Sequence, residues 1–266
     1  MAASTSSVRL RSIAIPPEHG AWGFLLEPIL LGLLIAPTLS GLLLSVAVAG
    51  AFLARHPLKI AMVDRRRGKR FARTALAERV ALAYLIPAAL AFAGADLIAG
   101  VEMLWPLLIA VPLAAIMFIS YAQNRGRDLL PELAGASALA VTASSLALAG
   151  DESAGTALAL WAILTARDAP SILYVRARLR LEKEKPYLLA LVLAANALGV
   201  TTVLALAVAG LAPALAVVAL IILAARAAYG LSPYRRRVRT QTIGVMEMGY
   251  GLMTALLTAI GYAAGW

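Results

Sequence analysis

Long apolar stretches recur along the whole chain, and they restrict its fold more than any other feature does. Each contains roughly 17–25 residues, enough for a helix to cross a bilayer core about 30 Å thick. Hydrophobic residues make up 62% of the 266 residues and charged residues only 14%, whereas soluble domains contain roughly 45–50% and about 25%. We therefore expect one polytopic, all-α membrane domain over residues 1–266.

The apolar stretches divide into nine predicted transmembrane spans. They are interpreted as helices, because barrel strands would alternate polar and apolar residues and these stretches do not. The first stretch carries Glu27 and no plausible small-residue cleavage site, so we interpret it as a retained span rather than a signal peptide. The predicted spans are 20–36, 40–63, 76–95, 102–121, 130–149, 154–175, 187–209, 211–229 and 243–265.

Basic residues occupy every second loop between these spans. The alternate loops, APTLSG, GADLIAGVE, GDESAG and AGLAP, contain no Lys or Arg. By the positive-inside rule, this pattern predicts a cytoplasmic N-terminus and a C-terminus outside. The net charge of +10 then reflects topology, and we expect no nucleic-acid partner. The basic segments are Arg9–Arg11, Arg65–Arg73, Arg125–Arg127, Arg176–Lys185 and Arg235–Arg239.

Ionisable side chains also lie inside the spans or at their cytoplasmic ends, where burial in a bilayer costs about 2.5–3.5 kcal/mol each on insertion scales. Such residues usually face a cavity or a partner, so we expect a polar cavity that opens to the cytoplasm. These residues include Glu18, His19, Glu27, Arg55, His56, Lys59, Asp64, Glu132, Arg167, Asp168, Arg176, Arg226 and Glu247.

The alternative interpretation is that these residues only form buried ion pairs. Glu27 would then pair with Arg55, and Asp168 with Arg167 or Lys59. Such pairs rarely add stability over apolar packing, so a scaffold alone gives little reason to keep so many of them. We therefore favour the functional cavity over simple pairing.

The loop segment Asp64–Arg70 contains one acid and five bases. Its simplest interpretation is topology together with attraction to anionic lipid headgroups. The alternative is a diphosphate clamp, because the guanidinium group of arginine binds phosphate with two parallel hydrogen bonds.

Metal and thiol chemistry receive little support. His19 and His56, the only histidines, could join Glu18 or Glu27 in a site of two histidines and one glutamate. Nothing in the spacing requires this, and we assign no metal ligand. The chain has no cysteine, which excludes disulfides and thiol nucleophiles.

Several stretches resemble the UbiA superfamily of intramembrane prenyltransferases. Gly50–Arg55 is similar to the end of that family's second helix, and Tyr121–Arg125 with Leu130–Gly135 is similar to its fourth-to-fifth helix junction. Ile243–Glu247 is similar to the start of its last helix. The resemblance implies a UbiA-like bundle of nine helices with a cavity for an isoprenoid.

A more specific resemblance is to the YwiC-like family of bacterial membrane proteins, which implies a multi-pass protein of the bacterial plasma membrane. It rests on Pro17–Trp22 with Glu27–Pro28, on Arg55–Pro57, and on Arg167–Ser171 leading into Tyr174–Arg178.

The chain departs from the prenyltransferases at their two aspartate-rich motifs. Those motifs hold Mg²⁺, which in turn holds the prenyl diphosphate. Here Asp64 stands alone at the first position and Asp168 at the second, both followed by arginines. Carboxylates are needed to anchor Mg²⁺ on phosphates, so the usual metal mechanism is in doubt, although the resemblance still implies the lipid cavity.

Our first hypothesis is an enzyme or binding protein for an isoprenoid or other lipid with an anionic, diphosphate-type head. Basic side chains would stabilise the negative charge in place of Mg²⁺, and acids, bases or histidines would transfer protons. The candidate catalytic residues are Glu18, His19, His56, Asp64 and Asp168. The candidate ligand-binding residues are Trp22, Glu27, Arg55, Lys59, Arg67, Lys69, Asn124, Arg125, Glu132, Arg167, Ser171, Tyr174, Arg176 and Arg180.

Two alternatives stay open. The chain could be a non-enzymatic binder of a quinone or haem-like cofactor, or an accessory subunit, with His19 and Trp22 against the ligand. It could also be a small-molecule transporter, with helices broken at Pro28, Pro57 and Pro170 around a site at the midplane.

Overall fold

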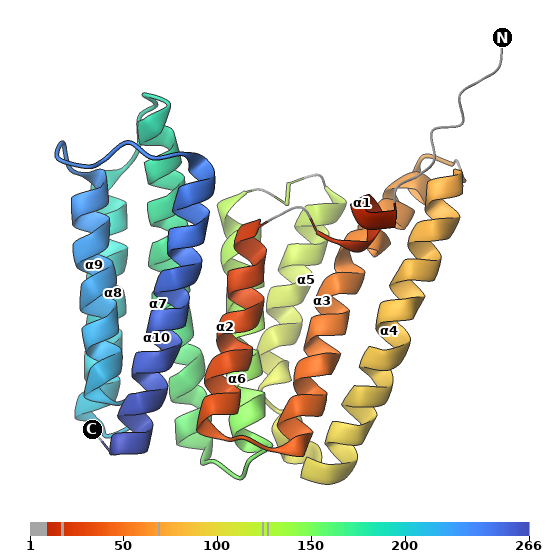
Figure 1. Ribbon diagram of the computed structural model, residues 1–266, viewed down its shortest axis with the longest axis horizontal. Coiled ribbons are helices and arrows are strands. Elements are labelled where there is room, and N and C mark those ends of the chain that lie inside the picture. The colour runs from red at the N-terminus through yellow and green to blue at the C-terminus, as the bar shows by residue number, and fades with distance from the viewer. Residues whose placement is uncertain (1–9, 17–18, 69, 124, 127, 266) are drawn as a thin grey trace.

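The structure is a computed structural model that describes residues 10–16, 19–68, 70–123, 125, 126 and 128–265, without the side chains of His19 and Ala122. Every regular element in this part of the chain is a helix, as the sequence predicts (Figure 1). The elements are α1 (Leu10–Ala14), α2 (His19–Ile35), α3 (Leu39–Arg66), α4 (Ala72–Ala99), the 3-10 helix η1 (Val101–Leu104), α5 (Leu107–Ala122), α6 (Leu129–Leu148), α7 (Ala154–Glu182), α8 (Leu189–Val208), α9 (Ala214–Leu231) and α10 (Thr240–Ala264).

Each predicted span coincides with a helix, but one of these helices is short. Eight helices of the described chain, α3 to α10 with η1 joined to α5, are long and apolar enough to cross a membrane. The helix α2 has 17 residues, which is about 25 Å at 1.5 Å per residue and less than a bilayer core of roughly 30 Å. The structure therefore shows a multi-span helical protein, and the count of nine stays a prediction.

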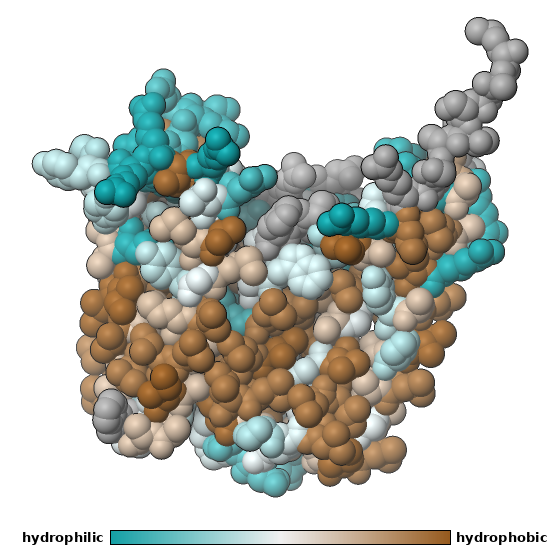
Figure 2. Space-filling view, viewed as in Figure 1, coloured by the Kyte–Doolittle hydropathy of each residue, from teal (hydrophilic) through white to brown (hydrophobic). Residues whose placement is uncertain are grey.

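The helices α2 to α10 alternate in direction, so the connecting loops gather at the two ends of the bundle (Figure 1). The loops that carry Arg67, Arg125, Lys183 and Arg236 share one end, which we call the basic end. Between the two hydrophilic ends the visible face is a broad apolar belt (Figure 2). Exposed aliphatic side chains, such as that of Leu90 in α4, are suited to contact with lipid tails.

The helices form two groups, α2 to α6 and α7 to α10, which meet where α6 packs on α7 and α2 packs on α10. Small residues fill this junction away from the basic end, where Ala140, Ala143 and Ala255 pack with Leu160 and Leu164. Small side chains let membrane helices approach closely. The junction is therefore closed over the half that lies away from the basic end.

The three prolines that were expected to break helices lie inside helices without ending them. The helices α2, α3 and α7 continue through Pro28, Pro57 and Pro170, so the expectation of broken helices is wrong. Pro170 has no amide to bond the carbonyl of Ala166, and Gly199 of α8 lies so close that a Cβ there would meet this carbonyl oxygen. The neighbouring helix thus covers the released carbonyl, as the interior of a membrane requires.

Candidate functional site

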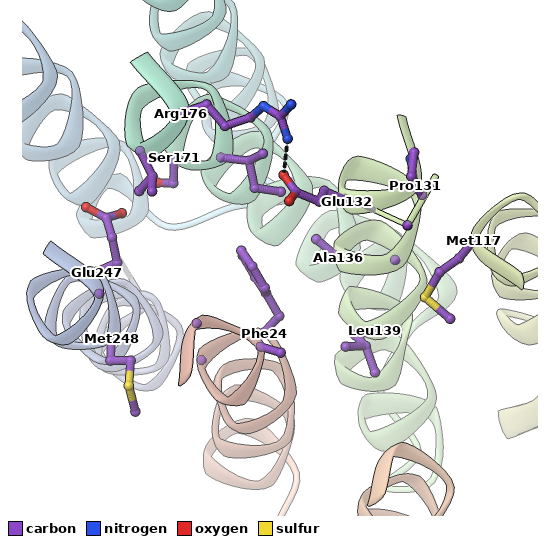
Figure 3. A pocket seen from close by; sticks show the side chains of 18 of the residues that line it. Phe24, Met117, Pro131, Glu132, Ala136, Leu139, Ser171, Arg176, Glu247 and Met248 are labelled. Atoms are coloured by element: carbon purple, nitrogen blue, oxygen red, sulfur yellow. Dashed lines mark hydrogen bonds and ion pairs between the residues drawn. The ribbon is translucent and has the colours of Figure 1, made fainter. Parts of the chain in front are cut away.

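A cavity of about 850 Å³ lies at the basic end of the junction between the two helix groups. Ligand pockets commonly measure roughly 300–1,000 Å³. The halves of α2, α3, α5, α6, α7 and α10 nearest the basic end form the wall, which is largely apolar and includes Phe24, Met117, Leu139 and Met248 (Figure 3). Charged and polar side chains interrupt this wall at Arg55, Lys59, Tyr121, Glu132, Arg167, Ser171, Arg176 and Glu247.

An ion pair joins the two helix groups across the cavity. Arg176 Nη1 of α7 lies 2.7 Å from Glu132 Oε2 of α6 (Figure 3). The two side chains are 39% and 37% exposed. Solvent therefore screens the pair, which holds the helices only weakly and leaves the guanidinium accessible to a ligand anion.

On the α3 side of the cavity, two cations lie on aromatic rings. The guanidinium of Arg55 is 4.6 Å from the ring centroid of Phe52 and 6.0 Å from that of Tyr121. The Lys59 ammonium is 4.6 Å from the Tyr121 centroid, and no carboxylate of the described residues forms an ion pair with it. Ring faces attract cations without neutralising their charge, so this wall keeps its positive potential.

On the opposite side, a buried network begins at Arg167 of α7. Its Nε lies 3.0 Å from Glu27 Oε1 of α2, and its Nη1 lies 2.8 Å from Asp168 Oδ1. Its Nη2 donates to the backbone carbonyl of Glu247 in α10 at 2.8 Å. One guanidinium thus links α2, α7 and α10 behind the cavity.

The network continues at Arg226 of α9. Its Nη1 donates to Glu247 Oε1 at 2.7 Å and its Nη2 to Ser171 Oγ at 3.2 Å. The same guanidinium lies 4.0 Å from the ring centroid of Tyr174 and 5.0 Å from that of Tyr250. Ring faces and hydrogen bonds together replace the water that this buried cation has lost.

Within the described residues, the network contains the carboxylates Glu27, Asp168 and Glu247 and the guanidinium groups Arg167 and Arg226. The carboxylates outnumber the guanidinium groups by one, so removing an arginine leaves more uncompensated charge than removing an acid does. Gly251 makes room for the pair on α2 and α7, because a Cβ there would lie 2.5 Å from Glu27 Oε2 and 2.8 Å from Arg167 Nη2.

The family model of the YwiC-like proteins matches residues 15–147, half of the chain. The chain belongs to the YwiC-like family. No curated protein and no solved structure matches it. The match covers α2 to α6 up to Ala147, so the family segment supplies Arg55, Lys59 and Glu132 to the cavity, and the remainder of the chain supplies Arg167 and Arg176.

Of the ion pairs expected from the sequence, this YwiC-like protein forms one and not the other. Asp168 pairs with Arg167, as predicted. The predicted pair of Glu27 with Arg55 is wrong, because Glu27 pairs with Arg167 and Arg55 lies on aromatic rings.

Several predicted site residues lie outside the lining of the cavity. His56 Nε2 is 3.1 Å from the carbonyl oxygen of Ser12, on the side of α3 that faces α1. The Asp64 carboxylate receives bonds from Arg73 at 2.5 and 2.9 Å and from Thr74 Oγ1 at 2.8 Å, so it ties the ends of α3 and α4 together.

Other predicted ligand-binding residues are held at the surface or against neighbouring rings. The ring of Trp22 packs edge-on against Phe52 with centroids 5.7 Å apart. Arg125 pairs with Asp128 at 2.8 Å, and Arg180 Nε donates to the Pro186 carbonyl oxygen at 2.6 Å.

Arg67 lines a groove next to the cavity. Asp168 and Tyr174 are buried behind the cavity, in contact with Arg167 and Arg226 respectively. Glu18, Lys69, Asn124 and the side chain of His19 lie outside the described residues.

The sequence predicts Arg226 and Glu247 inside spans but does not assign them to the site. Their partners lie on other helices, so spacing along one helix could not pair them, although charge at membrane depth was a sufficient signal to include both. Among the described residues, no group of three or more His, Cys, Asp or Glu side chains could hold a metal ion.

Proposed function

We propose that this YwiC-like protein binds a membrane lipid with a phosphate or diphosphate head, of which an isoprenoid diphosphate is one example. The single observation that carries the proposal is the division of the cavity wall. Apolar side chains such as Phe24, Met117 and Met248 can accept a lipid tail, and Arg55 and Lys59 present positive charge on aromatic rings.

The arrangement supports a lipid over a water-soluble anion. A free anion would need only the cations, whereas most of this wall is apolar and would gain from covering a hydrocarbon chain. Arg176 adds a third positive group, and its solvent-screened pair with Glu132 can give way when a phosphate arrives.

We also infer that α2 crosses the membrane as a ninth span. We further infer that the membrane is the bacterial plasma membrane and that the basic end faces the cytoplasm. The alternating helix directions and the basic loops at one end support this orientation. In this cysteine-free chain, a cysteine at Arg237 should react with an impermeant maleimide only after cells are opened, whereas one at Asp151 should react in intact cells. The reverse pattern would contradict the inference.

The binding proposal is tested with farnesyl diphosphate, farnesol and inorganic diphosphate, added to the purified protein in detergent while binding is measured by calorimetry. Charged hydrogen bonds contribute about 1.5–3 kcal/mol each, so Arg55→Gln with Lys59→Gln should weaken farnesyl diphosphate binding at least tenfold. The matched control is Arg237→Gln with Lys183→Gln, two exposed residues of the same end.

Equal binding by the cavity variant and the control would overturn the proposal, as would equal affinity for farnesol and farnesyl diphosphate. The same samples, incubated with an acceptor in EDTA, are then analysed for loss of the diphosphate. Release of inorganic diphosphate together with a farnesylated acceptor would extend binding to metal-independent transfer, whereas its release together with farnesol would indicate hydrolysis.

A further inference from the structure

A groove of about 260 Å³ runs beside the cavity between α3 and α5. It shares Arg55, Lys59 and Tyr121 with the cavity, so the two spaces adjoin along these side chains. Each of the two helices packs on α6, while α3 and α5 make few contacts with one another. The groove therefore separates the last turns of α3 and α5, next to the basic end.

The α3 side of the groove carries a row of cations. Arg55, Lys59 and Arg66 lie on one face of the helix, because they follow each other at spacings of four and seven residues. Eleven residues of helix extend about 16 Å. The row thus extends from the cavity to the basic end. A phosphate that moved along it could contact the three positive groups one after another.

Exposed apolar side chains form another part of the groove. Met62 of α3 is 41% exposed and Phe118 of α5 is 47% exposed, and both line the groove. Arg66 and Arg67 lie at its other end. A molecule that matches both features has a phosphate at one end and a hydrocarbon chain at the other, the chemistry of a lipid in the adjoining leaflet.

We propose that the groove between α3 and α5 is a lateral portal through which a phosphate-bearing lipid passes from the bilayer into the cavity. The headgroup first contacts Arg66 and then Lys59 and Arg55, while the tail slides past Met62 and Phe118. This inference rests on the proposed function, because it gives the ligand of that cavity a route from the membrane.

The test closes the portal and measures binding rates. Met62→Cys with Phe118→Cys is made in the cysteine-free chain, and a bifunctional methanethiosulfonate links the two thiols, with linkage confirmed by intact mass. The protein is placed in nanodiscs, and uptake of fluorescent farnesyl diphosphate is followed. The linked protein should take up and release the probe about tenfold or more slowly, within the range over which on-rates vary, and a reducing agent should restore both rates.

The double-cysteine protein treated with a monofunctional methanethiosulfonate is the matched control, because it carries the same modification without the bridge. Equal rates in the linked and control proteins would overturn the portal and leave the proposed function intact. If the control protein itself fails to bind the probe, the proposed function is wrong and the portal falls with it.

A second measurement examines the cations. Arg66→Gln should slow association severalfold and change the equilibrium Kd little, because this residue contacts the headgroup only in transit. An increase in Kd matching that of Lys59→Gln, without any slower association, would show that Arg66 belongs to the final site and would contradict the transit role.

Discussion

Two charged regions border the same cavity and differ in how their charges are compensated. Behind the cavity, Glu27 and Arg167 are each 3% exposed and lie 3.0 Å apart. On the α3 wall, Arg55 and Lys59 lie on aromatic rings and retain contact with solvent. Both regions are unusual at membrane depth. The first neutralises its cations with carboxylates of the same network, whereas no carboxylate of the described residues forms an ion pair with Lys59.

This difference distinguishes side chains that stabilise the fold from side chains that can bind a ligand. Breaking a buried pair leaves an uncompensated charge in a medium that cannot solvate it, so the network connects α2, α7, α9 and α10 and tolerates little change. An aromatic ring attracts a cation without neutralising it, so the cation can still bind an anion. The α3 wall is therefore the part of the cavity that can change partners without unfolding the protein.

The sharpest test of the comparison removes one cation from each region. Arg167→Met should destabilise the protein by about 3–5 kcal/mol, because it leaves Glu27 and Asp168 without their shared partner. Lys59→Gln should change stability by less than about 0.5 kcal/mol, as surface substitutions usually do. Unfolding in mixed detergent micelles measures both, and similar losses would remove the distinction between the regions.

Glu27→Gln is the control for this experiment, because it removes charge from the side of the network that is in excess. It should cost only about 1 kcal/mol, the scale of one hydrogen bond. A loss as large as that of Arg167→Met would show that the charge balance of the network is different from the one described.

A smaller effect should come from the packing of the network rather than its charge. Gly251→Ala places a Cβ 2.5 Å from Glu27 Oε2 and 2.8 Å from Arg167 Nη2, and such overpacking costs about 1–3 kcal/mol. Gly249→Ala on the same helix has nothing within 4 Å of its Cβ and should be neutral or stabilising by up to about 1 kcal/mol. The same unfolding assay applies, and equal values for the two variants would mean that the pair on α2 and α7 can move away.

The fold was predictable because its main constraint is local. Apolar length alone located the helices, since every backbone polar group in a bilayer must be satisfied within its own segment. Helix ends differ from the predicted ends where charged residues continue a helix beyond its apolar stretch, as α7 does from residue 175 to Glu182. The effect of Pro170 was not predictable, because the residue that covers the Ala166 carbonyl, Gly199, belongs to another helix.

The site was less predictable than the fold. Charge at membrane depth marked Glu27, Arg55, Lys59 and Arg167 correctly as unusual, but it could not say which of them face one another. Arg226 and Glu247 are also charged residues inside predicted spans. Only the contacts between α7, α9 and α10 show that they belong to the network.

The sequence by itself determined that the chain forms a helical membrane bundle whose basic loops share one end, because hydrophobic length and loop charge are properties of each segment alone. Only the tertiary structure decided that Arg167 is neutralised by Glu27 and Asp168 while Lys59 lies on Tyr121. The physical reason is that electrostatic pairing acts over a few ångströms in space, and helix packing decides which side chains come that close.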